Sequence, residues 1–209
     1  MYIDDVFDIK LEAHFRNDLT GIIAFTLATI QQGLSTCTRQ AMDVKRNGYN
    51  ASSLWALKSQ GLKYAVENKD FLYNKAVHII EKHGHESEEA VFEILKLFFL
   101  IPNIGIVKAG FIAQMLGFNI SCLDSHNLKR LGLKQTYFRV SKKAKTKIID
   151  KKIREYITLC QKKGSEYWWN TWCENVAGNT HNKSLPDAQA VSRYHVDTVN
   201  LFYEATKEL

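Results

Sequence analysis

The chain has 209 residues, of which 45% are hydrophobic and 24% charged, a composition typical of a globular protein with one or two small domains. Its formal net charge of +6 favours a polyanionic partner such as nucleic acid. No apolar run reaches the roughly 18 residues that span a bilayer, and the acidic start Met1–Asp5 lacks a signal-peptide pattern. The sequence therefore predicts an intracellular, cytoplasmic protein without a membrane partner.

Helical signals are frequent and strand signals are poor, so we expect an all-α protein. Residues 19–30 are apolar nearly all round, which predicts a central buried helix. Ser35 is placed to cap a second helix. A third helix is expected over 71–83, between a cap at Asp70 and a stop at Gly84.

Three further helices are expected around the middle of the chain. Ser87, followed by two glutamates, is a strong start for a helix that ends near Phe99. The next helix is expected over 107–116, with Gly117 after its end. Another begins near Asp124, a residue type that often caps helices.

The C-terminal third is also expected to be helical. Ser141 is placed to cap a long basic helix over 142–163, and the aromatic segment 167–172 begins another. A last helix follows Pro186 and Asp187. The sequence thus predicts helices throughout, interrupted by one clear loop at 178–184.

The order of these elements suggests two packed helical subdomains. We expect one domain over 18–133, with its hairpin at about 95–116. The second subdomain would consist of residues 1–17 plus 134–209.

The segment from Leu100 to Ala109 predicts a helix end, a tight turn and the immediate start of a second helix. Asn103 and Gly105 suit the turn because they tolerate positive φ. The second helix would present free N–H groups and the positive end of its dipole, which can bind a DNA phosphate without selecting a base sequence. An ordinary αα-hairpin explains the same residues, so the turn alone leaves both interpretations open.

With its neighbours, this segment resembles the helix-hairpin-helix superfamily of DNA glycosylases, in the endonuclease III and adenine-glycosylase branch. Residues 101–105 match the family's leucine-proline-glycine-hydrophobic-glycine hairpin, and 123–126 match its valine-aspartate-threonine-histidine run. Upstream, 72–76 looks like the family's segment before the hairpin. Residues 27–32 look like the helix end where the family places a glutamine that enters the duplex. The resemblance covers about 19–133.

The resemblance implies a catalytic carboxylate at Asp124, which would stabilise an oxocarbenium-like sugar or activate water. A helix cap is the alternative role for Asp124, and the two roles are compatible. It also implies that Gln32, with Gln31, fills the gap left by an extruded base; a solvated amide at a helix end is the alternative. The expected DNA-binding residues are Gln31, Gln32, Asn103, Gly105, Val107, Lys108, Lys142, Lys143 and Lys145.

Two further clusters allow a functional and a structural interpretation. The basic stretch 142–154 suits a phosphate-tracking face, although charged runs are usually solvated helix faces. Tyr167, Trp168, Trp169 and Trp172, with His126, are candidates for a base pocket, although aromatic clusters more often belong to a core. His195, on the last helix, is most simply a hydrogen-bonded core histidine, and a position near the site is the alternative.

The sequence departs from the family at three points. Val107 stands where bifunctional members carry a lysine, and Lys108 is turned from that position by about 100°. We therefore expect Lys108 to contact phosphate, without lyase activity. Leu27 stands where the adenine-removing branch has a glutamate, so adenine excision is not expected. The C-terminal cysteine pattern is absent and the four cysteines are scattered, so we expect reduced thiols, no iron–sulfur cluster, no metal and no other cofactor.

These observations predict a monomeric, monofunctional DNA glycosylase that acts on a flipped damaged or modified base in double-stranded DNA, as in base excision repair. Two alternatives remain open. One is a phage-type transferase that hypermodifies a DNA base on the same scaffold, and the other is a non-catalytic helix-hairpin-helix DNA-binding protein. The sequence does not separate the first two hypotheses, because the base pocket cannot be located from one chain.

Overall fold

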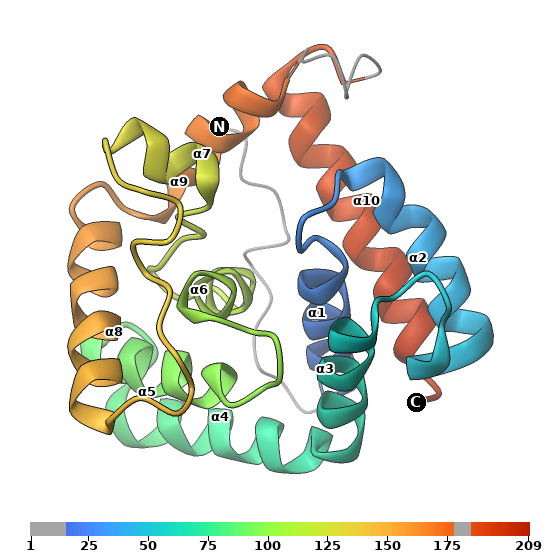
Figure 1. Cartoon of the computed structure of the whole chain (residues 1–209), viewed down its shortest axis with the longest axis horizontal. Coiled ribbons are helices and arrows are strands. Elements are labelled where there is room, and N and C mark those ends of the chain that lie inside the picture. The colour runs from blue at the N-terminus through green and yellow to red at the C-terminus, as the bar shows by residue number, and fades with distance from the viewer. Residues whose placement is uncertain (1–15, 178–184) are drawn as a thin grey trace.

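The computed structural model describes residues 16–177 and 185–209, and within these ranges the chain is all-α (Figure 1). No helix in this part of the chain is both long and apolar enough to cross a membrane. A short 3₁₀ turn, η3 (Gly48–Asn50), follows the second helix. The α-helices are α1 (Arg16–Ala28), α2 (Leu34–Asn47), α3 (Ala56–Glu67), α4 (Lys69–His83), α5 (Glu88–Phe99), α6 (Ile106–Met115), α7 (Ser125–Arg130), α8 (Thr146–Gln161), α9 (Ser165–Val176) and α10 (Ala188–Thr206).

The central buried helix predicted at the start of the chain is confirmed as α1. Its apolar side chains point in all directions because α10, α3, α4 and α6 surround it. The contact with α10 is close: a Cβ on Gly21 would lie 2.6 Å from the Tyr203 ring and 3.0 Å from its Cα. Only glycine therefore fits at this crossing of the first and last helices.

Several predicted helix ends are confirmed by their capping bonds. The Ser87 hydroxyl accepts a hydrogen bond from the Ala90 amide (3.1 Å) at the start of α5. The Asp187 carboxylate accepts one from the Ala190 amide (2.8 Å) at the start of α10. Gly84, at a φ of 76°, ends α4. These residues satisfy backbone groups that a helix leaves free at its ends.

Three predicted caps are wrong. Helix α2 already begins at Leu34, so Gly33 rather than Ser35 is its N-cap. Asp70 lies within the first turn of α4, one residue after the helix begins. Ser141 accepts a hydrogen bond from the Lys143 amide (3.2 Å) in a turn, and α8 begins only at Thr146.

The late start of α8 follows from what its residues can bury. The buried side chains of the helix are those of Ile153, Tyr156, Ile157 and Cys160, which recur at helical spacing. The lysine-rich residues 142–145 contribute no apolar side chain to this face, so packing does not extend the helix toward Ser141. Helix α3 was not predicted at all, and its start at Trp55 has no side-chain cap.

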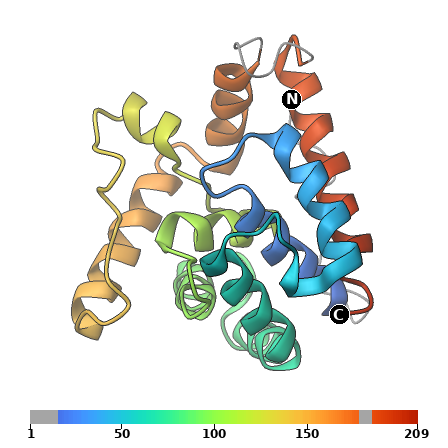
Figure 2. The same cartoon turned by 45° about the vertical axis from the view of Figure 1, so that its right-hand side comes forward.

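The helices form two groups that face each other across the molecule. Helices α1, α2, α3 and α10 lie on one side, while α6 to α9 lie on the other (Figures 1 and 2). The C-terminal helices are divided between the two groups, since α8 and α9 belong to one and α10, which contacts α1 and α2, belongs to the other. The division into 18–133 and a second subdomain stays a prediction, and residues 1–15 and the loop 178–184 lie outside the described residues.

Candidate active site

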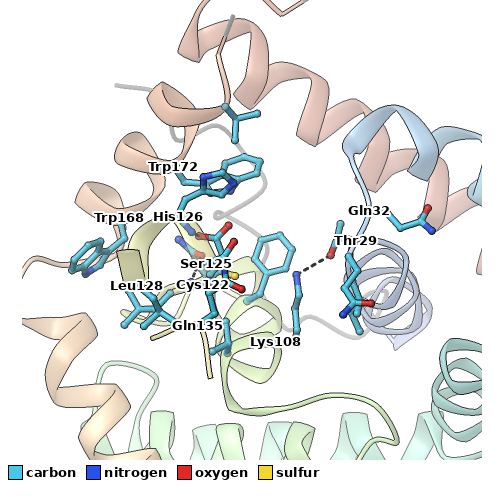
Figure 3. A pocket seen from close by; sticks show the side chains of 18 of the residues that line it. Thr29, Gln32, Lys108, Cys122, Ser125, His126, Leu128, Gln135, Trp168 and Trp172 are labelled. Atoms are coloured by element: carbon cyan, nitrogen blue, oxygen red, sulfur yellow. Dashed lines mark hydrogen bonds between the residues drawn. The ribbon is translucent and has the colours of Figure 1, made fainter. Parts of the chain in front are cut away.

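A cavity of about 900 Å³ lies between the two groups of helices. Figure 3 shows Thr29 and Gln32 on one side of it and Trp172, Ser125 and His126 across from them, with Lys108 between the two sides. The cavity thus joins segments that are far apart in the sequence. The predicted site residues that line it are Gln31, Gln32, Asn103, Val107, Lys108, Asp124, His126, Trp168 and Trp169.

The hairpin turn forms one edge of this cavity. Ile101 and Ile104 are buried and anchor the turn in the core, while Asn103 takes a left-handed φ of 65°. Gly105 has an extended backbone (φ −94°) and is the exposed N-cap of α6, so the expected need for positive φ at Gly105 is wrong. Backbone strain at the turn is therefore concentrated at Asn103.

The N-terminus of α6 keeps the features expected of an anion site. The first hydrogen bond of the helix runs from the Ala109 amide to the Gly105 carbonyl (2.8 Å), so the preceding amides have no partner within the helix. No acidic residue occupies the first turn. These amides, together with the helix dipole, favour an anion such as phosphate.

Asp124 is the N-cap of α7, as the sequence predicted. Its Oδ1 accepts hydrogen bonds from the amides of His126 (3.0 Å) and Asn127 (3.1 Å). The side chain also lines the cavity, so capping and exposure to the cavity occur together.

Side chains from α6, α8 and α7 itself hold the loop that carries Asp124. The Cys122 amide donates to Gln114 Oε1 (3.0 Å), and the Leu123 amide donates to the Tyr156 hydroxyl (3.1 Å). The Asn127 amide group donates to the Cys122 carbonyl (3.1 Å). Asp124 is therefore presented by a loop with fixed backbone rather than by a free surface turn.

Lys108 projects into the cavity. Its ammonium donates to Thr29 Oγ1 (3.1 Å) and lies 5.3 Å from the centre of the Phe111 ring. Figure 3 shows this bond bridging α6 and the end of α1. Burial raises the pKa of the Cys122 thiol to about 12, and the charge of Lys108 opposes that rise. The positive charge of Lys108 therefore lies in the cavity. The contact between Lys108 and a DNA phosphate, which the sequence suggested, stays a prediction.

The wall of the cavity that α9 and α10 form is aromatic, and we call it the aromatic wall. Trp169 and Trp172 stack with ring centres 5.2 Å apart and planes inclined by 25°. His195 contacts the edge of Trp169 at 4.7 Å and lies 5.5 Å from Phe111. Trp168 lies deeper, because its indole N–H donates to the Cys160 carbonyl of α8 (3.1 Å). This wall contains the three tryptophans suggested for the base pocket. Trp168 is the one that packs mainly into the core.

His195 differs from the hydrogen-bonded core histidine that the sequence suggested. It is fully buried, but neither ring nitrogen has a hydrogen-bond partner in the described structure. Burial, reinforced by the nearby charge of Lys108, lowers its pKa from 6.5 to about 3, so the ring is neutral at physiological pH. The expected hydrogen bond is therefore absent, and His195 lines the cavity instead.

Three of the predicted lysines lie outside the cavity. Lys142 donates to the carbonyls of Phe99 and Ile101, where it caps the end of α5 and holds the hairpin turn. Burial of this ammonium lowers its pKa to about 8. Lys143 and Lys145 are exposed just before α8. Their contact with DNA stays a prediction.

Among the cavity residues that sequence reasoning did not single out are Phe111 and Gln114 on α6. The spacing of α6 could have indicated both, because Val107, Phe111 and Gln114 follow one another at intervals of four and three residues on one helix face. Trp172 and His195 meet only because α9 packs on α10. No local pattern in the sequence indicates that contact.

Both non-glycine residues with positive φ in the described chain line this cavity. They are Gln31, at 55°, and Asn103, at 65°. Such conformations often occur at functional sites, where the surrounding structure maintains them. No group of three His, Cys, Asp or Glu side chains in the described ranges is placed to hold a metal ion, and all four cysteines are free thiols.

Comparisons with protein-family models, with curated proteins and with solved structures found no match to this chain. The resemblance to helix-hairpin-helix glycosylases therefore rests on the motifs of this chain alone.

Proposed function

We propose that this protein binds double-stranded DNA through its helix-hairpin-helix element and cleaves the N-glycosidic bond of an extruded damaged or modified base, without lyase activity. One observation carries the proposal. A single cavity is lined by Asp124, by the hairpin residues Asn103 and Lys108, by Gln32 and by an aromatic wall. Each member corresponds to one requirement of base excision: phosphate anchoring, charge stabilisation, gap filling and base stacking.

Asp124 is the residue that acts on the sugar. Its Oδ1 is fixed by two backbone amides, while its other oxygen accepts no hydrogen bond from the described residues. That oxygen faces the positive charge that develops on the sugar as the bond to the base breaks, or it takes a proton from the attacking water. The amide bonds hold the carboxylate in place, so little reorganisation is needed during the reaction.

Gln31 and Gln32 belong to the connection between α1 and α2 and line the cavity, and Gln32 lies across it from Ser125 and His126 (Figure 3). In the proposed complex, this connection enters the duplex at the position that the extruded base has left. The amides at the start of α6 bind a phosphate next to it. The two contacts hold the DNA on either side of the cavity entrance.

The size of the cavity also favours a second candidate, a transferase that modifies the base and leaves the sugar bond intact. At about 900 Å³, the cavity is near the upper end of the roughly 300–1,000 Å³ of small-molecule sites. When a base is bound, a cavity of this volume still has room for a second small molecule beside Lys108.

Product analysis tests the two candidates. Duplexes that carry a panel of damaged and modified bases are incubated with the protein and analysed by mass spectrometry. A glycosylase releases free base and leaves an abasic site that breaks only on heating or in alkali. A transferase changes the mass of the base when a small-molecule cell extract, which supplies the group donor, is added to the incubation. Asp124→Asn should abolish release and keep DNA affinity; a protein that binds DNA but changes none of the panel would contradict both candidates.

A further inference from the structure

We infer that Gln114 and His195 read the hydrogen-bonding edge of the base in the cavity, and that they select a keto base, in which a carbonyl oxygen stands beside a ring N–H. Uracil, thymine and hypoxanthine have this edge, whereas cytosine and adenine present an amino group beside an unprotonated ring nitrogen. The inference rests on the proposed function, because it assigns the selectivity of the same cavity.

The first observation is a set of polar atoms that lack partners. Gln114 is 1% exposed and its Nε2 has no hydrogen-bond partner, while His195 is 0% exposed and lacks partners for both ring nitrogens. Both residues line the cavity. A buried polar group without a partner costs about 1–3 kcal/mol, and such groups are rare in folded proteins. A ligand in the cavity would supply the missing bonds.

The amide of Gln114 has a defined orientation. The backbone amide of Cys122 can only donate, so the atom that faces it at 3.0 Å is the carbonyl oxygen Oε1. Nε2 is therefore the unpartnered atom, and it is a donor. The group that Gln114 awaits is an acceptor, such as a base carbonyl.

His195 supplies the complementary group. Its ring is neutral, and a neutral imidazole has one N–H donor and one bare nitrogen that accepts. The bare nitrogen can accept the ring N–H that stands next to the carbonyl of a keto base. One donor from α6 and one acceptor from α10 thus match a carbonyl beside an N–H.

The surrounding rings provide faces for a planar ligand. Phe111 lies one turn before Gln114 on α6 and also contacts His195 (5.5 Å). Trp169 and Trp172 also lie close to His195, at 4.7 and 6.2 Å between ring centres. Aromatic faces stack on any base, so they bind the base without choosing it. The choice is left to Gln114 and His195.

The test uses free bases, which need neither DNA nor bond cleavage. Tryptophan fluorescence is followed while the 1-methyl derivative of uracil or cytosine, or the 9-methyl derivative of hypoxanthine or adenine, is added, because Trp169 and Trp172 lie in the cavity wall. The methyl group replaces the sugar and removes the extra ring N–H through which free cytosine would also present a carbonyl beside an N–H. We expect saturable quenching, with uracil and hypoxanthine binding at least about tenfold more tightly than their amino counterparts, since a mismatched edge leaves buried groups unpaired.

Two variants test the assignment. His195→Phe keeps an aromatic ring in the aromatic cage and removes both unpartnered nitrogens, so it should remain folded and lose most of the preference. Gln114→Met, with folding checked by thermal denaturation, should do the same. Gln135→Met is the matched control: it removes an exposed amide at the cavity edge and should keep the preference.

The outcomes separate this inference from the proposed function. A preference that persists in both variants, a preference for amino bases, or no saturable quenching by any base would overturn the inference. Release of bases from DNA without any such preference would overturn it too, while leaving the glycosylase proposal intact. Preference for free keto bases in a protein that changes no DNA would support the inference and contradict the proposed function.

Discussion

The two walls of the cavity are built in different ways. The hairpin wall comes from one continuous stretch, 101–126, and contributes charge and backbone groups: the amides of α6, Lys108 and Asp124. The aromatic wall joins α9 and α10, on either side of residues 178–184, and contributes rings and the neutral His195. Under the proposed function, the hairpin wall holds the DNA backbone and sugar and contributes Phe111 and Gln114 to the base site, while the aromatic wall surrounds the rest of the base.

The largest expected effect lies on the hairpin wall, where Asp124 caps α7 and has the proposed catalytic role. Asparagine is as good an N-cap as aspartate, so Asp124→Asn should leave stability unchanged and slow base release by about a hundredfold or more. Asp124→Ala should lose the same activity and also about 1 kcal/mol of the free energy of unfolding. Single-turnover kinetics and urea denaturation measure the two effects. An active Asp124→Asn enzyme would reduce Asp124 to a helix cap.

The aromatic wall should be most sensitive to acid. The pKa of His195 is about 3 in the folded protein and near 6.5 when unfolded, so below pH 6.5 the unfolded chain binds a proton that the folded protein does not. Relative to His195→Phe, the wild type should lose about 1.4 kcal/mol of unfolding free energy per pH unit between pH 6.5 and 3. Above pH 6.5 the difference should be constant. Denaturation of both proteins from pH 7 to pH 4 checks this; a difference independent of pH would show that His195 becomes protonated in the folded state.

The turn in the hairpin wall predicts a smaller effect on stability. Asn103 has a φ of 65°, a conformation that costs a residue with a Cβ about 1–2 kcal/mol, with less strain for asparagine. Asn103→Ala should therefore lower the free energy of unfolding by about 1 kcal/mol, while Asn103→Gly should leave it unchanged. Equal stability of the two variants would mean that the turn relaxes to another conformation.

The smallest expected effect is a difference between variants of two neighbouring lysines, Lys142 and Lys143. Lys143 is exposed, whereas the ammonium of Lys142 is bonded to two carbonyls of the hairpin. Lys143→Met should reduce the log–log salt slope of DNA binding by about one and leave the melting temperature unchanged. Lys142→Met should lower the melting temperature and change the slope little. The opposite result would place Lys142 on the DNA and remove Lys143 from it.

The contrast between the hairpin wall and the aromatic wall also explains which features could be predicted from the sequence. The hairpin, the cap at Asp124 and the caps at Ser87 and Asp187 depend on bonds between residues a few positions apart, which a sequence pattern records. The start of α8 was misplaced because Ser141 is a good cap by type, although the apolar face that stabilises the helix begins later. Helix α3 begins without a side-chain cap, and its buried face consists of Lys58, Gly61, Leu62 and Ala65, which do not form a recognisable apolar stripe in the sequence.

The aromatic wall shows the limit of local patterns. Trp172 and His195 belong to helices whose separate patterns each suggest a buried face, and their meeting at a cavity depends on how α9 packs against α10. His195 was expected to find a hydrogen-bond partner in the core. Its lack of one follows from the phenylalanine and tryptophan rings around it, which come from α1, α6 and α9.

The central claim is that an extruded base enters the cavity between the hairpin and the aromatic wall, and photocrosslinking tests it most directly. A duplex with a single mismatched 5-iodouracil is bound to the wild-type protein and irradiated, and the linked peptides are identified by mass spectrometry. A base in the cavity should crosslink to Trp169, Trp172 or Phe111, whose rings line it. Crosslinks confined to the lysine-rich surface at 142–152, or to other residues outside the cavity, would contradict the claim.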